Sequence, residues 1–319
     1  MAASGRSRGL AAVLVTAVLA GAGLGAQEPP PEVTKAQFDA WMTELSNWGR
    51  WGDDDQLGAL NLITPAKRVE AAKLVQTGRT ASMARPIEMQ VLDDPDAASA
   101  NRKPVLMGAV RSVFDIDTDN GYFWERYEVE YHGLLLSHLD ALCHVAYEGK
   151  VYNGRTFEEI ATADDGCSAM GIINAREGLV TRGVLIDMPG MAVTRADIEA
   201  WEAEKGITIS SGDALFLRTG RDVGQQGGYH PSLIPFFKER DIALLGSDVP
   251  QEGGTVEGVA IPIHVFTLVA LGVHLFDNLG LEDLARTADE IGRWEFLFMA
   301  SPHVVPNGAG SAMNPIAVF

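Results

Sequence analysis

The segment Ser137–His144, with the sequence Ser-His-Leu-Asp-Ala-Leu-Cys-His, carries three side chains that bind metals or move protons. They are His138, Asp140 and His144, and the residues between them are mainly apolar. Imidazole nitrogen and carboxylate oxygen are ligands suited to zinc and manganese. A bound divalent ion lowers the pKa of a water molecule toward neutrality and so supplies a nucleophile for hydrolysis. The segment therefore predicts the site of a metal-dependent hydrolase.

A change of backbone conformation within the segment would bring these groups together. Residues two apart on a strand share a face, which places His138 beside Asp140. Four residues make about one helical turn, so His144 returns to that face if the chain turns or becomes helical near Ala141. The alternative is a core segment whose histidines hydrogen-bond to the backbone. Two histidines that bracket an aspartate favour the metal site.

His264 and Asp277 form a second group of candidate ligands. His264 begins an apolar stretch that ends at Gly272, as in a short helix with a C-terminal glycine. Residues 273–278 are typical of a strand that contains Asp277, and alternation places His274 on its opposite face. For His264, a capping or core role competes equally with metal binding. Metal binding requires the unit to fold back so that His264 meets Asp277.

Helix and strand patterns alternate along the chain. Thr64 with Pro65, and Thr194 with Gly206, mark the ends of helices. Helices are predicted at 35–45, 64–75 and 194–205, and strands at 123–132, 183–188, 214–218 and 242–245. Interleaved helices and strands favour an α/β fold. Neither an internal repeat nor a shift of composition indicates a second domain.

The N-terminus has the pattern of a secretory signal peptide. Arg6 and Arg8 precede an uncharged stretch from Gly9 to Ala26 that is rich in Ala, Leu, Val and Gly. We predict a signal peptide over 1–26, a Pro-rich tether over 27–34 and a single hydrolase domain over 35–319. A retained anchor is the alternative, but the stretch is short and Gly-rich for a bilayer span. We therefore expect a periplasmic or secreted protein without stable membrane insertion.

The net negative charge of the chain indicates which classes of binding partner it can have. The 319 residues include 25 basic and 43 acidic side chains, for a net charge of −18, and removing the two arginines of the signal region lowers this to about −20. Such a surface repels nucleic acid and offers no basic anchor for anionic lipid. A small neutral or cationic substrate fits it better than a polyanion, although acidity mainly aids solubility.

The two cysteines, Cys143 and Cys167, are too few for a disulfide framework. An exported chain can pair them, but Cys143 lies inside the predicted site, where a bridge would restrict ligand geometry. We expect both to act as packing residues. Cys143 is also a poor candidate for a nucleophile activated by His144, because neighbours on a strand point to opposite faces.

Taken together, these residues resemble the cyclase family that includes bacterial kynurenine formamidase and isatin hydrolase. Its signature has the form His-x-Gly-Thr-His-x-Asp-x-Pro-x-His, and Ser137–His144 matches the second His, the Asp and the final His. Gly212–Gly220 is similar to the family's Gly-Asp-x-x-x-x-Arg-Thr-Gly segment, and 246–248 carries Gly-Ser-Asp. The resemblance extends from about Trp48 to the C-terminus. It implies a layered β/β/α fold, with a central barrel-like mixed sheet flanked by helices, that is commonly oligomeric.

The resemblance also implies roles for individual residues. His138 and Asp140 would bind metal, His144 would transfer protons, and His264 and Asp277 would complete the site or hold a second ion.

This chain departs from the family pattern at three positions. The family's first His would stand at position 134, which is Leu134. His132 is the substitute, but six strand residues span about 20 Å, so it reaches the metal only if the chain from Gly133 forms a loop or bulge. Leu142 replaces the signature Pro. Asp277 stands where the formamidases have Glu, and the side chain of Asp is the shorter of the two.

The predicted reaction is hydrolysis of an amide, a cyclic amide or a related ester or lactone, as in an arylformamidase or a cyclic amidase. Trp48, Trp51 and Phe123 are candidates for an apolar substrate wall, with core packing as the alternative for each. Two other functions stay open: an exported non-catalytic protein that binds a small molecule or metal, and a metal-dependent dehydratase. The Gly-x-Ser-x-Gly match at residues 5–9 lies in the predicted signal peptide and not between a strand and a helix, so it does not support a serine hydrolase.

Overall fold

The helices begin and end at the capping residues of the sequence. In the computed structural model, which describes residues 1, 30–87, 90–91, 110–134, 136–190, 192–220 and 227–319, Thr34 caps α1 and Thr64 caps α2. Thr194 forms a reciprocal capping box with Asp197, and Gly206 ends α5 in the left-handed conformation. The main helices are α1 (Lys35–Glu44), α2 (Pro65–Ala72), α4 (Phe157–Ile160), α5 (Arg195–Lys205), α6 (Ile234–Glu239), α7 (Pro262–His264) and α8 (Glu282–Ile291).

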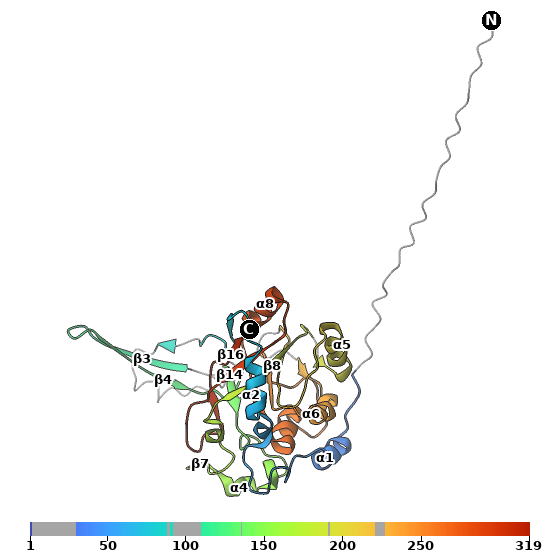
Figure 1. Cartoon of the computed structure of the whole chain (residues 1–319). Helices are drawn as coiled ribbons and strands as arrows, with labels where there is room; N and C mark the ends of the chain where they lie inside the picture. Colours follow the sequence, from blue (N-terminus) through green and yellow to red (C-terminus); the bar gives the residue numbers. More distant parts are fainter. Residues whose placement is uncertain (2–29, 88–89, 92–109, 135, 191, 221–226) are drawn as a thin grey trace. The chain divides into compact units, whose positions relative to one another are not determined.

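A nine-stranded mixed sheet, curved into a half-barrel, forms the centre of the fold. Figure 1 labels three of its strands, β8, β14 and β16. Its order is β1-β16-β14-β8-β10-β12-β13-β5-β15. The four strands from β8 to β13 are parallel, and the remaining pairs are antiparallel. Their bounds are β1 Thr80–Ser82, β5 His138–Asp140, β8 Leu179–Asp187, β10 Ala214–Arg218, β12 Leu244–Ser247, β13 His274–Asp277, β14 Glu295–Ala300, β15 Gly310–Ala312 and β16 Ile316–Val318.

Three smaller sheets accompany the main one. β3 (Val110–Asp117) and β4 (Tyr122–Val129) form a hairpin beside β2 (Gln90–Val91), and two short pairs join β6 (Ala161–Thr162) to β7 (Gly166–Cys167) and β9 (Ala192–Val193) to β11 (Gly228–Tyr229). β4 ends at Val129, three residues before the predicted strand end at His132. The chain from Tyr131 onward is therefore free to bend toward the site.

The interior of the sheet is filled by phenylalanine rings. Phe216 lies 4.8 Å from Phe298 and 6.1 Å from both Phe276 and Phe296, measured between ring centroids. Gly246 makes room for this cluster, because a Cβ there would lie 2.6 Å from the Phe216 ring. The parallel strands are buried on both faces, which explains why their sequences are continuous apolar runs.

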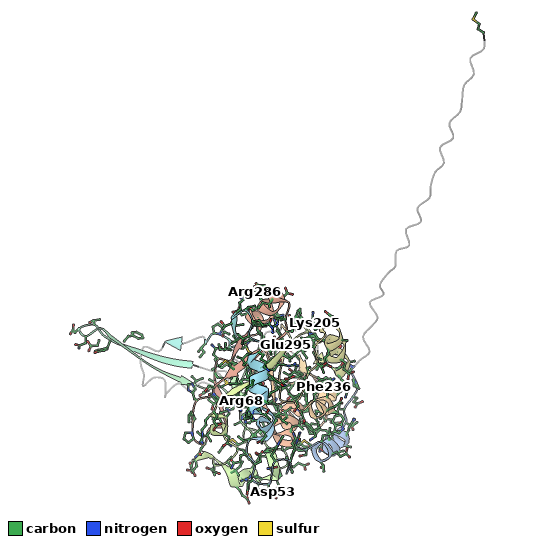
Figure 2. All side chains as sticks on the ribbon, viewed as in Figure 1. Asp53, Arg68, Lys205, Phe236, Arg286 and Glu295 are labelled. Atoms are coloured by element: carbon green, nitrogen blue, oxygen red, sulfur yellow. A yellow bond between two sulfur atoms is a disulfide. The ribbon has the colours of Figure 1, made fainter. Side chains whose placement is uncertain are left out.

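Helix α8 carries exposed ion pairs. Arg286 on α8 pairs with Asp283 at 2.8 Å and with Glu290 at 3.3 Å, and Figure 2 shows it at the outer surface of that helix. These exposed pairs contribute little to stability.

The predicted α/β fold with a barrel-like mixed sheet is confirmed, and Pro31–Phe319 form one compact unit. The short helix that was predicted to end at Gly272 differs in one respect: α7 continues as a π-helix at Val265–Leu271 before Gly272 ends it. The predicted signal peptide lies outside the described residues apart from Met1. Among the residues that are described, no helix is both long and apolar enough to cross a bilayer.

Candidate metal centre

Strand pairing brings the two predicted ligand groups together. β5 lies antiparallel to β13, with His138 opposite Asp277 and Asp140 opposite Leu275. Directly opposed residues share a face of the sheet. His138, Asp140 and Asp277 therefore project to the same side, and His274 projects to the other, as the alternation predicts.

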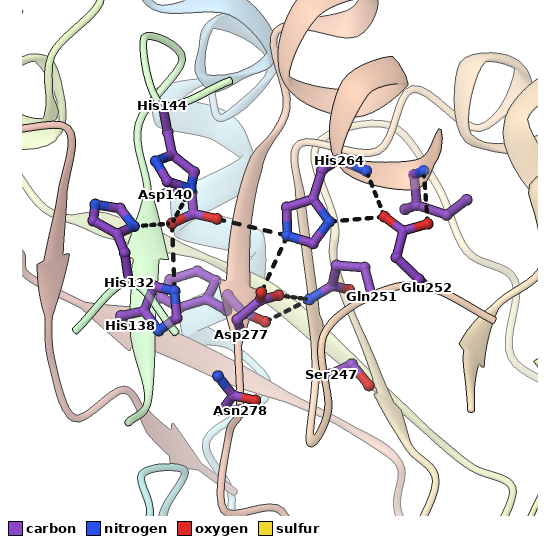
Figure 3. A network of polar contacts seen from close by, with 12 residues as sticks. His132, His138, Asp140, His144, Ser247, Gln251, Glu252, His264, Asp277 and Asn278 are labelled. Atoms are coloured by element: carbon purple, nitrogen blue, oxygen red, sulfur yellow. Dashed lines mark hydrogen bonds and ion pairs between the residues drawn. The ribbon is translucent and has the colours of Figure 1, made fainter. Parts of the chain in front are cut away.

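Asp140 is the centre of the cluster (Figure 3). Its carboxylate is 1% exposed. One oxygen, Oδ1, lies 3.1 Å from His132 Nδ1, 3.5 Å from His138 Nε2 and 4.0 Å from His144 Nε2. The other, Oδ2, lies 3.8 Å from His264 Nε2. Four imidazoles thus surround one buried carboxylate.

A bend in the chain carries His132 into the cluster, as its assignment as a ligand requires. The segment after β4 is irregular, and Asn278 holds it by donating to the Gly133 carbonyl at 2.6 Å. Tyr131 donates to the Gly310 carbonyl at 2.9 Å. His132 then stacks on His144 with ring centroids 3.9 Å apart and planes 10° apart.

Gly310 on β15 leaves the space that the His132 ring occupies. A Cβ at this position would lie 2.6 Å from the Leu139 carbonyl oxygen and 2.8 Å from His132 Cε1. Overpacking of this kind usually costs about 1–3 kcal/mol of stability, so we expect Gly310→Ala to displace His132 and thereby to weaken metal binding. Isothermal titration with zinc, with His132→Ala as the comparator, measures the effect. Unchanged affinity in Gly310→Ala would contradict a ligand role for His132.

A backbone contact fixes the tautomer of His138. Its Nδ1 lies 2.7 Å from the Leu136 carbonyl oxygen, which can only accept, so Nδ1 carries the proton. Nε2 therefore presents a lone pair toward Asp140. This is the arrangement by which proteins orient a metal-binding imidazole.

His264 is oriented in the same way by a carboxylate. Its Nδ1 lies 2.8 Å from Glu252 Oε1, and its Nε2 lies 3.1 Å from Asp277 Oδ2. Gln251 in turn donates to Asp277 Oδ1 at 2.6 Å and to the Phe276 carbonyl at 2.7 Å. Both groups of the second cluster are thus held by outer partners.

Glu252 and Gln251 were not predicted from the sequence. Both follow the carboxyl end of β12, a parallel strand, and this edge of a parallel sheet is where ligand-binding residues gather. That placement is the signal that could have indicated them. Glu252 also accepts from the backbone N–H groups of Ile263 and His264, which ties the start of α7 to the site.

The ionisation of the cluster favours a cation between its members. Burial alone would raise the pKa of the Asp140 carboxyl, but the contact with His132 and the electrostatic interaction with the other three histidines hold this pKa well below its usual value. His138 Nε2 lies 3.5 Å from the carboxylate oxygen Oδ1, so a cation bound there would have one donor atom from each residue.

A proton occupies the equivalent place at His264 when no metal is bound. Burial alone would lower the pKa of His264, but Asp277 and then Glu252 outweigh it and raise this pKa well above its ordinary value. A metal ion would displace that proton, because only the neutral imidazole is a ligand.

The donor atoms form two overlapping groups, each of which could hold a metal ion. His132, His138 and Asp140 form one group, and Asp140, His264 and Asp277 form another; within each group the donor atoms lie within 4.8 Å of one another. Nitrogen and carboxylate oxygen suit zinc and manganese alike. Asp140 belongs to both groups.

His144 differs from the other histidines. The chain after Asp140 forms a turn closed by His144 N–H and the Ala141 carbonyl at 2.9 Å, where the sequence left open a turn or a helix. Its side chain is 29% exposed. Burial lowers the pKa of His144 and Asp140 opposes this only in part, so the ring is neutral at neutral pH. A neutral, partly accessible imidazole beside metal ligands is suited to accept a proton.

The expectation that the cysteines act only in packing is wrong. Cys143 and Cys167 form a disulfide with Cα atoms 6.3 Å apart. The turn after β5 explains the error, since it lets Cys143 bond to Cys167 while His144 stays beside Asp140. The bridge leaves the ligand geometry intact.

The contacts of Trp48 and Trp51 are with other parts of the protein than the ligand cluster. Trp48 donates to the Val269 carbonyl at 2.6 Å, and Trp51 packs against the core. Phe123 is 60% exposed, so core packing does not apply to it. A cavity of about 590 Å³ lies next to the site instead, and it is bordered by Tyr131, whose ring centroid is 4.6 Å from that of His132.

Comparisons with known proteins agree with this architecture. The family model described as "Putative cyclase" matches residues 81–252, which is more than half of the chain. The chain belongs to this cyclase family. A crystal structure described as a novel cyclase is 29% identical, with a TM-score of 0.74, and the match covers 87% of this chain and 99% of that one.

An isatin hydrolase bound to the product analogue thioisatinate shares the cyclase fold. It is 19% identical, with a TM-score of 0.50, over 80% of this chain and 95% of its own. A comparison with curated protein sequences gives no significant match.

The other segments that resemble the cyclase family build the frame of the site. Asp248 is buried and accepts from Thr219 N–H and Oγ1 and from Gly220 N–H, at 2.8–3.0 Å. Asp213 is fully buried and pairs with Lys67 at 2.6 Å. These carboxylates fix the ends of β10 and β12 and so position the loop that carries Glu252.

Proposed function

We propose that this cyclase-family protein is a metal-dependent hydrolase that cleaves an amide, a cyclic amide or a related ester or lactone of a small molecule. The observation that carries the proposal is the cluster itself: one buried carboxylate shared by two ligand groups, with a neutral histidine beside it. The fold shared with an isatin hydrolase is consistent with it.

Zinc or manganese would be held by His132, His138 and Asp140, and by Asp140, His264 and Asp277. When bound, a divalent ion supplies Lewis acidity that polarises a carbonyl and acidifies water. The protein supplies the rest. Leu136 and Glu252 keep the imidazole lone pairs directed inward, and Gln251 holds Asp277 in place.

His144 is the proposed catalytic residue. Its ring is neutral at neutral pH and lies 4.0 Å from Asp140, at the border of the ligand cluster. It would take a proton from the attacking water and return it to the leaving nitrogen or oxygen. A C–N bond other than a peptide bond, as in an arylformamide or a cyclic amide, is the target that we propose first, in keeping with the fold shared with an isatin hydrolase.

The test measures both the metal content and the turnover of wild type and of His144→Ala. We expect signal-free protein purified without chelator to hold stoichiometric zinc or manganese and to hydrolyse members of a panel of formamides, cyclic amides and lactones. His144→Ala should keep its metal and lose about 100-fold or more in kcat, the usual contribution of a general base. Elemental analysis and a discontinuous assay measure the two quantities.

Other outcomes would assign other functions. Metal loss in His144→Ala would make His144 a ligand instead. Metal-replete protein inert on the whole panel would favour the non-catalytic binding protein, and loss of water from a hydroxy acid would favour the dehydratase. Protein that takes up no metal would contradict the hydrolase.

We further propose that the protein is exported and assembles as a homo-oligomer. The signal-like N-terminus and the Cys143–Cys167 bridge support an oxidising compartment such as the periplasm. The acidic surface supports a small-molecule substrate and argues against nucleic acid. Cell fractionation and light scattering test the two proposals; a cytoplasmic, reduced chain or a monomer would contradict them.

A further inference from the structure

We propose that the Cys143–Cys167 disulfide positions His144, so that proton transfer at the site depends on the oxidised bridge while the metal ligands on β5 do not. The inference rests on the proposed hydrolase function. It assigns Cys143 and Cys167 as positioning residues.

The turn that carries His144 has few other supports. Cys143 N–H donates to the Met170 carbonyl at 3.2 Å, and His144 N–H closes the turn on Ala141 at 2.9 Å. Within the described part of the chain, the His144 side chain makes no hydrogen bond; it stacks on His132 and lies 4.0 Å from Asp140. The covalent bond one residue before His144 is therefore the strongest restraint on its position.

The other end of the bridge is firmly held. Cys167 lies on β7, and its N–H donates to the Asn307 carbonyl at 2.9 Å. Three residues later, Met170 adopts a left-handed backbone with φ of 60° and donates to Gln56 Oε1 at 3.0 Å. Ile172 N–H reaches the Gly308 carbonyl at 2.8 Å. The segment from Cys167 to Ile172 is thus held by contacts with parts of the chain outside the turn.

The metal ligands of β5 have different supports. His138 and Asp140 lie between β13 and β15, and the strand ladders on both sides fix their backbone. Loss of the disulfide removes none of these hydrogen bonds. The bridge should therefore act on His144 and leave His138 and Asp140 unaffected.

The redox step is an ordinary exchange. A dithiol donates two electrons and two protons, the S–S bond breaks to give the two thiols, and the dithiol becomes a disulfide. Cys143 and Cys167 are 2% and 6% exposed, so a reductant reaches them only when the segment opens. Substitution is therefore a cleaner probe than reduction.

The experiment compares four metal-loaded proteins: wild type, Cys143→Ala/Cys167→Ala, His144→Ala, and the triple variant. All are assayed at a temperature at which circular dichroism shows each to be folded. We expect the double variant to keep its metal stoichiometry and KM and to lose about 10-fold or more in kcat. In the His144→Ala background, removing the bridge should cost no further activity, because the bridge acts through His144.

Amide hydrogen exchange provides a readout that does not require activity. The double variant should exchange faster at 141–146 and remain protected at 138–140. An equal loss of kcat in the His144→Ala background, a loss of metal, or unchanged exchange at 141–146 would overturn the inference. If wild type is inactive on every substrate, the proposed function fails, and the exchange measurement still decides whether the bridge fixes the turn.

Discussion

Asp140→Asn is expected to abolish metal binding at both ligand groups and to reduce turnover to background. Asp140 contacts both His138 and His264, and no other side chain belongs to both groups of ligands found among the described residues. Substitution of an outer partner of a metal ligand already costs 10–100-fold in affinity, so we expect loss of this shared ligand to cost more than about 100-fold. Elemental analysis and isothermal titration with zinc or manganese measure the loss.

The matched control is Asp277→Asn, which alters one ligand group alone. We expect it to retain the ion held by His132, His138 and Asp140 and to lose the other. Both variants should fold, because β5 and β13 pair through backbone groups. Equal metal loss in the two variants would show that all five ligands hold a single ion. Full metal content in Asp140→Asn would contradict the site itself.

Local rules predicted the parts of the site that lie close together in sequence. The spacing of His138 and Asp140 on a strand placed them on one face, and the fold confirms it. Capping residues marked α2 and α5, although α2 ends at Ala72 and not at Val75. The ends of the other helices and strands depend on how apolar segments pack against one another, and the sequence of one segment alone does not reveal this.

The rest of the site is built by tertiary contacts between residues that are distant in the sequence. Glu252 reaches His264 across 12 positions through the loop after β12, and Asn278 holds Gly133 across 145. Nothing within either segment indicates its partner. The disulfide was missed because a bridge at Cys143 was expected to restrict the ligand geometry, whereas the turn after β5 lets Cys143 bond to Cys167 while His144 stays beside Asp140.

His274 should make the metal-free protein lose stability as the pH falls from about 6.5 to about 4. The side chain is 1% exposed, and neither ring nitrogen has a hydrogen-bond partner in the described part of the chain. Burial lowers the pKa of His274 to about 4, with Asp140 opposing only in part. The folded protein keeps the ring neutral down to that pH, whereas the unfolded chain takes up the proton near pH 6.5.

Between pH 6.5 and 4 the unfolded chain binds more protons, so the free energy of unfolding decreases as the pH falls, and the loss is complete below the folded pKa. A depression of this size corresponds to about 3 kcal/mol. His264, whose pKa is raised, acts in the opposite direction: its contribution is present below pH 6.5 and lost as the pH rises through the folded pKa.

A comparison of wild type with His274→Leu separates the two histidines, because His264 contributes equally to both proteins. Urea unfolding in the presence of chelator, at steps from pH 4 to pH 8, gives the free energy of each. The free energy of unfolding of His274→Leu minus that of wild type should be about 3 kcal/mol larger at pH 4 than at pH 8. A constant difference across this range would show that His274 is protonated or solvated in the folded protein, and that acid sensitivity originates in the metal ligands.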